Sequence, residues 1–112
     1  MLKITPSWVE LMTAAALSCF ANNAVDVAVI EVGMLGRYDA TNIADAKVAI
    51  ITNVGFDHTD GSEGWRKKLA WEKAGIIKKD TTVIIGRKQI ETRVVFQEKA
   101  KTERDNTYHT KV

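Results

Sequence analysis

Three runs of apolar residues in this chain have no regular polar interruption. They cover residues 25–32, 48–52 and 81–86. Continuous apolar runs of this length are typical of strands in parallel sheets that are covered on both faces. Because parallel strands are joined by long crossovers, usually helices, the pattern predicts an α/β fold with a mostly parallel sheet flanked by helices.

The first helical signal precedes these runs. Ser7 and Glu10 have the spacing of a capping box, in which each side chain bonds to the other residue's backbone N–H. We expect a helix over residues 8–21, ended by Asn22 and Asn23. Apolar residues occupy most of its circumference, which predicts a largely buried helix.

Two further helices are expected between and after the later runs. The second covers residues 65–74 and ends at Gly75, which would act as a left-handed cap. The third covers residues 89–104 and is expected to be a surface helix. Its apolar stripe consists of Ile90, Val94 and Val95. Residues 105–112 have no pattern and are expected to form no regular element.

Composition excludes several classes of protein. The 112 residues suit one compact domain or part of a larger one, and the net charge of +2 is too small to indicate binding to nucleic acid or to a membrane surface. Cys19 is the only cysteine, which excludes an internal disulfide and favours a cytoplasmic protein. The apolar run after Lys3 is too short to span a bilayer and indicates a buried helix, so we expect no membrane partner.

Three polar side chains stand in positions that suggest chemistry. Glu31 ends the first apolar run, and His58 follows the second. The carboxyl ends of parallel strands share one rim, where ligands bind. Lys73 lies one helical turn after Leu69 and faces inward if Leu69 does. A carboxylate, an imidazole and an inward amine on one rim would form a cation site.

Each of these side chains also has an ordinary structural explanation. Glu31 can pair with Arg37 across the following loop, and His58 can cap a turn. Lys73 can extend to solvent and complement the C-terminal helix dipole, a contribution of about 0.3–1 kcal/mol. Residue type and spacing alone leave both interpretations open.

Three motifs, however, resemble a known family. They are "VDVAVIEVGMLGRYDATN", "VAIITNVGFDHTD" and "WEKAGII". They resemble, in the same order, motifs of the central domain of folylpolyglutamate synthase and dihydrofolate synthase, which belong to the Mur ligase superfamily. The resemblance covers residues 6–86 and implies part of a P-loop-type central domain. "DATN" and "EKAGI" favour the folate branch over the cell-wall peptide ligases.

The resemblance implies roles for individual residues. The glutamate of "EVG" and the histidine of "DHT" would bind Mg²⁺ beside the phosphates of ATP; the lysine of "EKAGI" would be carbamylated, engage a second Mg²⁺ and serve catalysis. "ITN" would place an asparagine near the nucleotide, and "DATN" would contribute to the pterin pocket. These positions are Glu31, His58, Lys73, Asn53, Asp39, Ala40 and Thr41. Carbamylation needs an uncharged amine, which burial favours.

The reaction that the resemblance implies is ATP-dependent acyl activation in folate and one-carbon metabolism. ATP would phosphorylate a carboxylate of dihydropteroate or of a folate, and the amine of L-glutamate would attack the acyl phosphate. The partners would then be small molecules: ATP, L-glutamate and dihydropteroate or folate.

The chain also departs from the family pattern. None of its seven glycines is followed by lysine, so the phosphate-binding loop G-x-x-x-x-G-K-[ST] is absent from residues 1–112. The family has this loop upstream of the Glu31 motif and a further domain downstream, and it usually has a glycine where Leu35 stands. We therefore expect a partial central domain that is inactive alone. A non-catalytic interaction module and a cell-wall peptide ligase relative are the alternatives.

Overall fold

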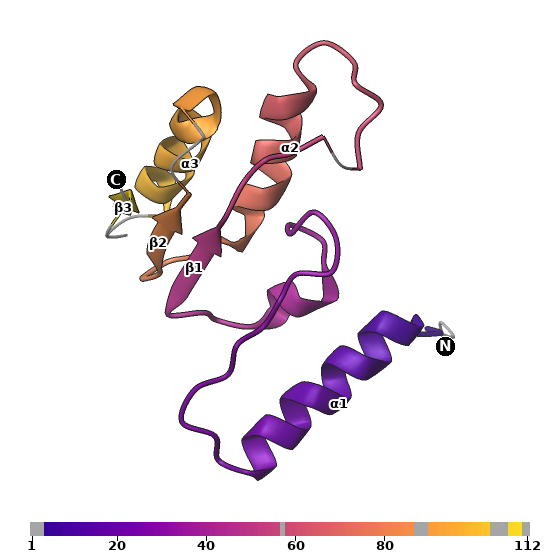
Figure 1. Ribbon diagram of the computed structural model, residues 1–112. Coiled ribbons are helices and arrows are strands. Elements are labelled where there is room, and N and C mark those ends of the chain that lie inside the picture. Colours follow the sequence, from indigo (N-terminus) through magenta and orange to yellow (C-terminus); the bar gives the residue numbers. More distant parts are fainter. Residues whose placement is uncertain (1–3, 57, 87–89, 104–107, 111–112) are drawn as a thin grey trace.

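The computed structural model describes residues 4–56, 58–86, 90–103 and 108–110 (Figure 1). Helices and strands alternate through most of the chain. The elements are α1 (Trp8–Asn22), η1 (Ala40–Ile43), β1 (Val48–Ile51), α2 (Trp65–Lys73), η2 (Ala74–Ile76), β2 (Thr82–Ile85), α3 (Ile90–Thr102) and β3 (Tyr108–Thr110), where η denotes a 3₁₀ helix.

The three strands form one parallel sheet in the order β1-β2-β3. Val48 is aligned with Thr82, and Val83 is aligned with Tyr108. The crossover from β1 to β2 contains α2, and the crossover from β2 to β3 contains α3. The predicted α/β class with a parallel sheet is therefore confirmed. The expectation that residues 105–112 form no regular element is wrong for β3, because three residues are too few to produce a periodic pattern.

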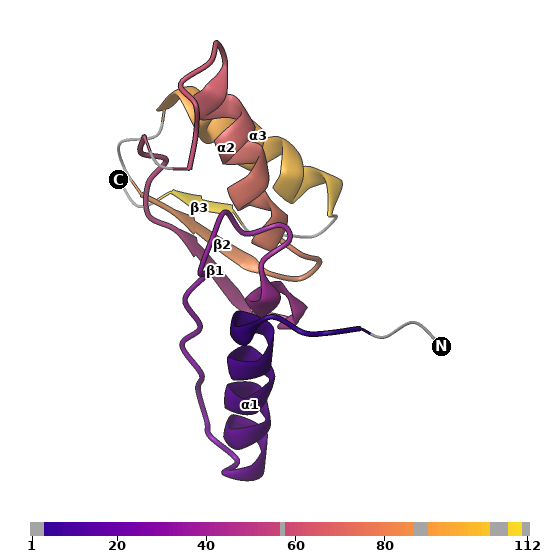
Figure 2. The same cartoon turned by 90° about the vertical axis from the view of Figure 1, so that its right-hand side faces the viewer.

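The core lies between the sheet and the pair α2 and α3, which Figure 2 shows together on one side of the strands. Alternate residues of β1 and β2 point into it, as the pleat of a strand requires. The buried cluster consists of Ile51, Val54, Leu69, Ala70, Ala74, Ile77, Val83, Ile85, Phe96 and Ala100.

The opposite face of β1 is open in this chain. Ile50 is 58% exposed and Val48 is also exposed, whereas Ala49 and Ile51 are buried. The expectation that the run at residues 48–52 is covered on both faces is therefore wrong for the described part of the chain. Among the described elements, α2 and α3 pack on one face of the strands, and Val48 and Ile50 on the other face stay exposed.

The predicted strand at residues 25–32 is not formed. This segment runs from α1 to the next loop without strand pairing, and Val29 is 91% exposed. A strand needs a neighbouring backbone edge to satisfy its N–H and C=O groups, and no described strand supplies one here. Its apolar sequence alone therefore does not make it a strand.

The bounds and caps of α1 agree closely with the sequence, but its burial does not. The Ser7 N–H donates to Glu10 Oε2 at 2.6 Å, and the Glu10 N–H donates to Ser7 Oγ at 3.3 Å, so the capping box is formed. The Glu10 carboxylate also interacts with the Ser7 side chain, and this interaction, followed by the hydrogen bond from the Ser7 backbone N–H, lowers the pKa of Glu10. No residue of α1 is buried, so the prediction of a largely buried helix is wrong. Among the described elements, α1 packs mainly against the short η1.

Within the described part of the chain, no helix combines the length and apolar character that crossing a membrane requires.

The buried face of α3 differs from the predicted stripe. Thr92, Phe96 and Ala100, spaced by four residues, are buried. Val94 is 55% exposed, so its assignment to the stripe is wrong, whereas Val95 is partly buried against the core. The side chain of Ile90 lies outside the described residues. Among the described elements, this face of α3 packs mainly against α2.

The position of Phe96 gives a test of this packing. Phe96→Ala removes a fully buried ring and should lower the free energy of unfolding by about 3–5 kcal/mol. Val94→Ala, on the exposed side of the same helix, should change it by less than about 0.5 kcal/mol. Urea denaturation of both variants measures the difference, and equal losses would contradict the assigned orientation of α3.

Candidate functional site

The loop of residues 33–45, called here the 33–45 loop, is organised around Asp39. One carboxylate oxygen of Asp39 accepts from the Met34 N–H at 2.8 Å, and the other accepts from the Thr41 N–H at 2.9 Å. Partial burial alone would raise the pKa of Asp39, but the hydrogen bonds from Thr41, Met34 and Gly33 outweigh it and hold the pKa below its ordinary value of 3.8. The ionised carboxylate thus folds the loop around itself.

Arg37 joins this loop to the C-terminal end of α2. Its backbone N–H donates to the carbonyl oxygen of Glu72 at 3.1 Å, and its Nη2 donates to the carbonyl oxygen of Trp71 at 2.9 Å. The guanidinium carbon lies 3.5 Å from the centroid of the Trp71 ring, which is a cation–π contact. One side chain therefore contacts α2 through both its charge and its donors.

Two glycines allow the loop and the helix to come this close. Gly36 has a φ of +141° and is buried; a Cβ there would lie 3.2 Å from the Glu72 carbonyl oxygen. A Cβ on Gly75 would lie 2.4 Å from the Cα of Arg37. Gly75 does not have a positive φ, so its predicted role as a left-handed cap is wrong. It is the close approach of Arg37 that requires a glycine at position 75.

The far end of the loop is fixed to the residues that follow α2. Asn42 Nδ2 donates to the carbonyl oxygens of Arg37 and Gly75, at 2.8 Å and 3.2 Å. Lys78 Nζ donates to the carbonyl oxygens of Asn42 and Ala44, at 2.5 Å and 2.9 Å. The 33–45 loop is consequently held against α2 and η2 along most of its length.

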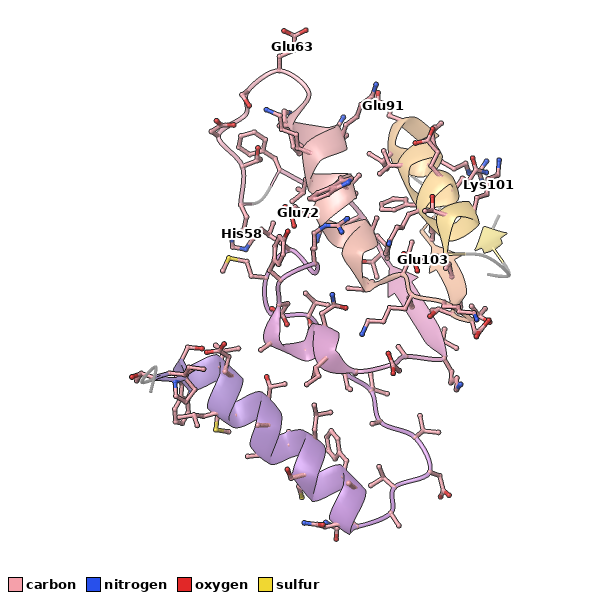
Figure 3. The ribbon with its side chains drawn as sticks, turned by 180° about the vertical axis from the view of Figure 1, so that it is seen from behind. His58, Glu63, Glu72, Glu91, Lys101 and Glu103 are labelled. Atoms are coloured by element: carbon pink, nitrogen blue, oxygen red, sulfur yellow. The ribbon has the colours of Figure 1, made fainter. Side chains whose placement is uncertain are left out.

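A pocket of about 280 Å³ opens beside this contact. The 33–45 loop, the segment after β1 and α2 each supply part of its wall. The lining residues are Leu35, His58, Thr59, Asp60, Ser62, Trp65, Lys68, Leu69 and Glu72. His58 and Glu72 come from different segments on the same side of the molecule (Figure 3). Hydrogen bonds from Ser62, first that of its backbone N–H, lower the pKa of Asp60.

The structure places the three predicted metal residues in different settings. His58 is exposed, has a φ of +51° and lines the pocket. Glu31 is exposed in the segment before the 33–45 loop, and Lys73 is partly buried at the end of α2, where Leu69 is buried. Neither Glu31 nor Lys73 lines this pocket. The described residues contain no group of three His, Cys, Asp or Glu side chains able to hold a metal, so a shared ion stays a prediction.

The remaining predicted residues lie in two separate segments, one that follows β1 and one that precedes it. Asn53 is exposed just after β1, and Asp39, Ala40 and Thr41 are partly buried where η1 begins. Their contacts with nucleotide and pterin also stay predictions. The alternative pairing of Glu31 with Arg37 is wrong for the described structure, because the guanidinium of Arg37 contacts Trp71 and no ion pair joins it to Glu31.

The sequence model of the Mur ligase middle domain matches residues 7–110 of this chain. The chain belongs to the Mur ligase middle-domain family. The predicted resemblance to this superfamily is therefore confirmed.

Curated Mur ligase relatives include enzymes of folate metabolism. The dihydrofolate synthase/folylpolyglutamate synthase of Escherichia coli (strain K12) is 40% identical over 98 residues, covering 86% of this chain and 23% of the relative. The same enzyme of Mycobacterium tuberculosis is 49% identical over 84 residues, covering 70% of this chain and 17% of the relative. The chain thus spans about a fifth of the length of these relatives.

Solved structures show the same relation. Mycobacterium tuberculosis folylpolyglutamate synthase, complexed with ADP and AMPPCP, is 40% identical and superposes with a TM-score of 0.86 over 94% of this chain and 24% of its own. A folylpolyglutamate synthase (FPGS), solved as a complex with AMPPCP and folate, is 32% identical to this chain. It superposes with a TM-score of 0.87 over 96% of this chain and 26% of its own. The Mur ligase fold of the chain, including the exposed α1, therefore agrees with that of larger proteins.

Reasoning from sequence alone missed the part that Arg37 and Glu72 play in this Mur ligase segment. Both lie inside the quoted motifs, beside Gly36 and Lys73. The sequence signal for this contact was Gly75. A glycine is expected there for two different reasons, the end of a helix or the close approach of another backbone segment. Only the coordinates show that Arg37 is the residue that approaches.

Gly75→Ala should disrupt this contact. Its Cβ would overlap the backbone of Arg37, and the forced shift should cost about 1–3 kcal/mol in free energy of unfolding. Gly55→Ala is the matched control, because a Cβ at Gly55 meets nothing within 4 Å. Urea denaturation compares the two, and a Gly75→Ala variant as stable as Gly55→Ala would contradict the close approach.

Asp39→Asn should alter the dependence of stability on pH. The folded-state pKa of Asp39 lies below 3.8, so its ionised form stabilises the fold above that value, and the contribution is lost as pH falls through the folded-state pKa. The variant should be less stable by about 1 kcal/mol at pH 7, and the difference should shrink below the ordinary pKa. Urea denaturation from pH 7 to pH 3 measures it, with the exposed Asp26→Asn as control; a difference that is constant with pH would contradict the role of Asp39.

Proposed function

We propose that this chain is the central ATP-binding segment of a ligase that adds L-glutamate to dihydropteroate or to a folate. The observation that carries the proposal is the 40% identity and TM-score of 0.86 with a folylpolyglutamate synthase complexed with ADP and AMPPCP, over 94% of this chain. The folate branch is further supported by curated relatives that are dihydrofolate synthases/folylpolyglutamate synthases. The same proposal assigns the protein to folate metabolism and places it in the cytoplasm.

Magnesium is the ion that we propose for this site, and the residues present fit it in part. The exposed Glu31 carboxylate offers the oxygen ligand that Mg²⁺ prefers, whereas a neutral His58 would be a less usual ligand. No described cluster supplies three protein ligands, so nucleotide phosphates and water would complete the coordination. When bound, the ion would offset charge on the transferred phosphoryl group.

Lys73 is the proposed catalytic residue because of its place at the end of α2. Its side chain is partly buried and follows the buried Leu69 by one turn. Carbamylation there would replace a cation with an anion able to hold a second Mg²⁺. The adjacent contact between Arg37 and α2 would hold this end of the helix in place.

The 33–45 loop is the proposed pterin site, with Asn53 near the nucleotide. Both carboxylate oxygens of Asp39 already accept hydrogen bonds inside the loop. Asp39 therefore shapes the loop, and Ala40 and Thr41 at the start of η1 would present its surface to the substrate.

In the proposed reaction, a substrate carboxylate oxygen attacks the γ-phosphorus of ATP and ADP leaves. The amine of L-glutamate then attacks the acyl carbon, loses a proton and expels inorganic phosphate. The segment described here would contribute positioning and charge neutralisation to these steps.

Expression of the complete reading frame around this chain tests the proposal. ADP should be released only when L-glutamate and either dihydropteroate or a folate are present with magnesium and ATP. Lys73→Ala should lower kcat by about 100-fold or more, whereas Lys67→Ala, exposed on the same helix, should retain activity. The 112-residue chain alone should release no ADP.

A parallel assay with UDP-linked peptide substrates separates the folate and cell-wall branches. ADP release with those substrates, and none with dihydropteroate or folates, would overturn the folate assignment. Absence of ADP release with either class would favour the non-catalytic interaction module.

A further inference from the structure

An aromatic contact joins the two ends of the stretch of residues 58–64, called here the 58–64 segment. Phe56 lies before the segment and Trp65 directly after it, and their ring centroids are 5.1 Å apart at an interplanar angle of 83°. Edge-to-face pairs of this kind attract each other beyond the effect of the apolar area that they bury. Phe56 is 70% exposed, so burial does not explain the position of its ring. The ring is therefore held mainly by contacts with its near neighbours.

Gly61 gives this ring a place against the segment. It has a φ of +73°, and a Cβ at this position would lie 3.1 Å from Cε2 of Phe56. Gly64 has nearly the same φ, +76°, but a Cβ there would meet nothing within 4 Å. Both positions need a backbone conformation that glycine adopts easily. Of these two glycines, Gly61 alone also leaves room for the Phe56 ring.

Trp65 connects the aromatic contact to the core. Its side chain packs against the buried cluster, and the guanidinium carbon of Arg66 lies 4.8 Å from the centroid of its ring. Its backbone N–H donates to the carbonyl oxygen of Ser62 at 3.0 Å, and the Ser62 N–H donates to Asp60 Oδ1 at 2.9 Å. The 58–64 segment is thus closed by an aromatic contact at its ends and by hydrogen bonds within it.

His58 begins the segment in an unfavourable backbone conformation. Its φ of +51° lies in the left-handed region, which a residue with a side chain adopts at a cost in population of about tenfold. Such a conformation persists where the surrounding structure holds it. An aromatic pair contributes a factor of about two to ten, so the contact between Phe56 and Trp65 can offset much of this cost. Residues of the segment and Trp65 together form one wall of the pocket, and His58 belongs to that wall.

We propose that Phe56, Gly61 and Trp65 are positioning residues that close the 58–64 segment and thereby hold His58 on the wall of the pocket. Loss of the aromatic contact would let the segment open and the imidazole move away from that wall. The closure of the segment is independent of the proposed function. Its effect on catalysis rests on that function, in which His58 binds Mg²⁺.

Two glycine substitutions in the complete protein test the closure, because their backbone costs are matched. Gly61→Ala should displace the Phe56 ring and remove the nuclear Overhauser contacts between the ring protons of Phe56 and Trp65. Gly64→Ala should retain these contacts, since its Cβ meets no neighbour. Contacts that persist in Gly61→Ala, that disappear equally in both variants or that are missing from the wild type would overturn the proposal.

Amide hydrogen exchange measures the opening of the segment without reference to activity. Phe56→Leu removes the ring and should speed exchange of the Ser62 N–H by about fivefold. Trp65→Phe keeps a pair of rings and should stay within about twofold of the wild type. The Gly86 N–H, which donates to the Ile51 carbonyl oxygen at 2.9 Å, reports on unfolding of the sheet and should not change in Phe56→Leu. Unchanged exchange at Ser62, or equal acceleration at Ser62 and Gly86, would overturn the proposal.

The magnesium dependence of the reaction distinguishes positioning of His58 from general support of the fold. Phe56→Leu should raise the magnesium concentration for half-maximal ADP release by about fivefold and leave KM for L-glutamate unchanged. Trp65→Phe should retain the magnesium dependence of the wild type. A lower kcat with unchanged magnesium dependence in Phe56→Leu would overturn the positioning role. If the wild type releases no ADP, the proposed function fails, and the ring contacts and exchange rates still decide whether the segment is closed.

Discussion

The site described here depends on one contact, the stacking of Arg37 on Trp71 together with its hydrogen bonds to the end of α2. The 33–45 loop contains only the short η1 as regular structure, so its shape must come from side chains. Asp39 folds the loop internally, and Arg37 fixes the folded loop to the helix. This attachment is sterically possible because residue 75 is a glycine and has no side chain.

Local rules predicted the three α-helices well. The capping box at Ser7 and Glu10 and the crossover helix before β2 depend on neighbours within a few residues, so the sequence contains their determinants. Burial was harder to predict. The apolar circumference of α1 and the apolar residues 25–32 indicate a preference for contact, but the contact must come from another layer, and none covers them among the described residues.

For the candidate site, the sequence predicts which residues carry chemistry but not how they are supported. Glu31, His58 and Lys73 stand out by type, whereas Glu72 resembles any charged helix residue. Leu35 is a similar case: it adopts a φ of +61°, which costs a leucine about 1–2 kcal/mol. Its side chain packs against the core cluster, and this burial offsets the backbone cost.

The same reasoning explains why exposed apolar surface and a well-formed loop coexist in one chain. The loop is stabilised by contacts with α2 and η2, all within residues 33–78, and needs no further layer. By contrast, the exposed α1 and the open face of β1 are apolar without a covering layer, although solved structures of larger proteins superpose on nearly the whole chain. The conformation around Arg37 is therefore specified by contacts within residues 33–78, whereas the apolar surface of α1 has no covering layer among the described residues.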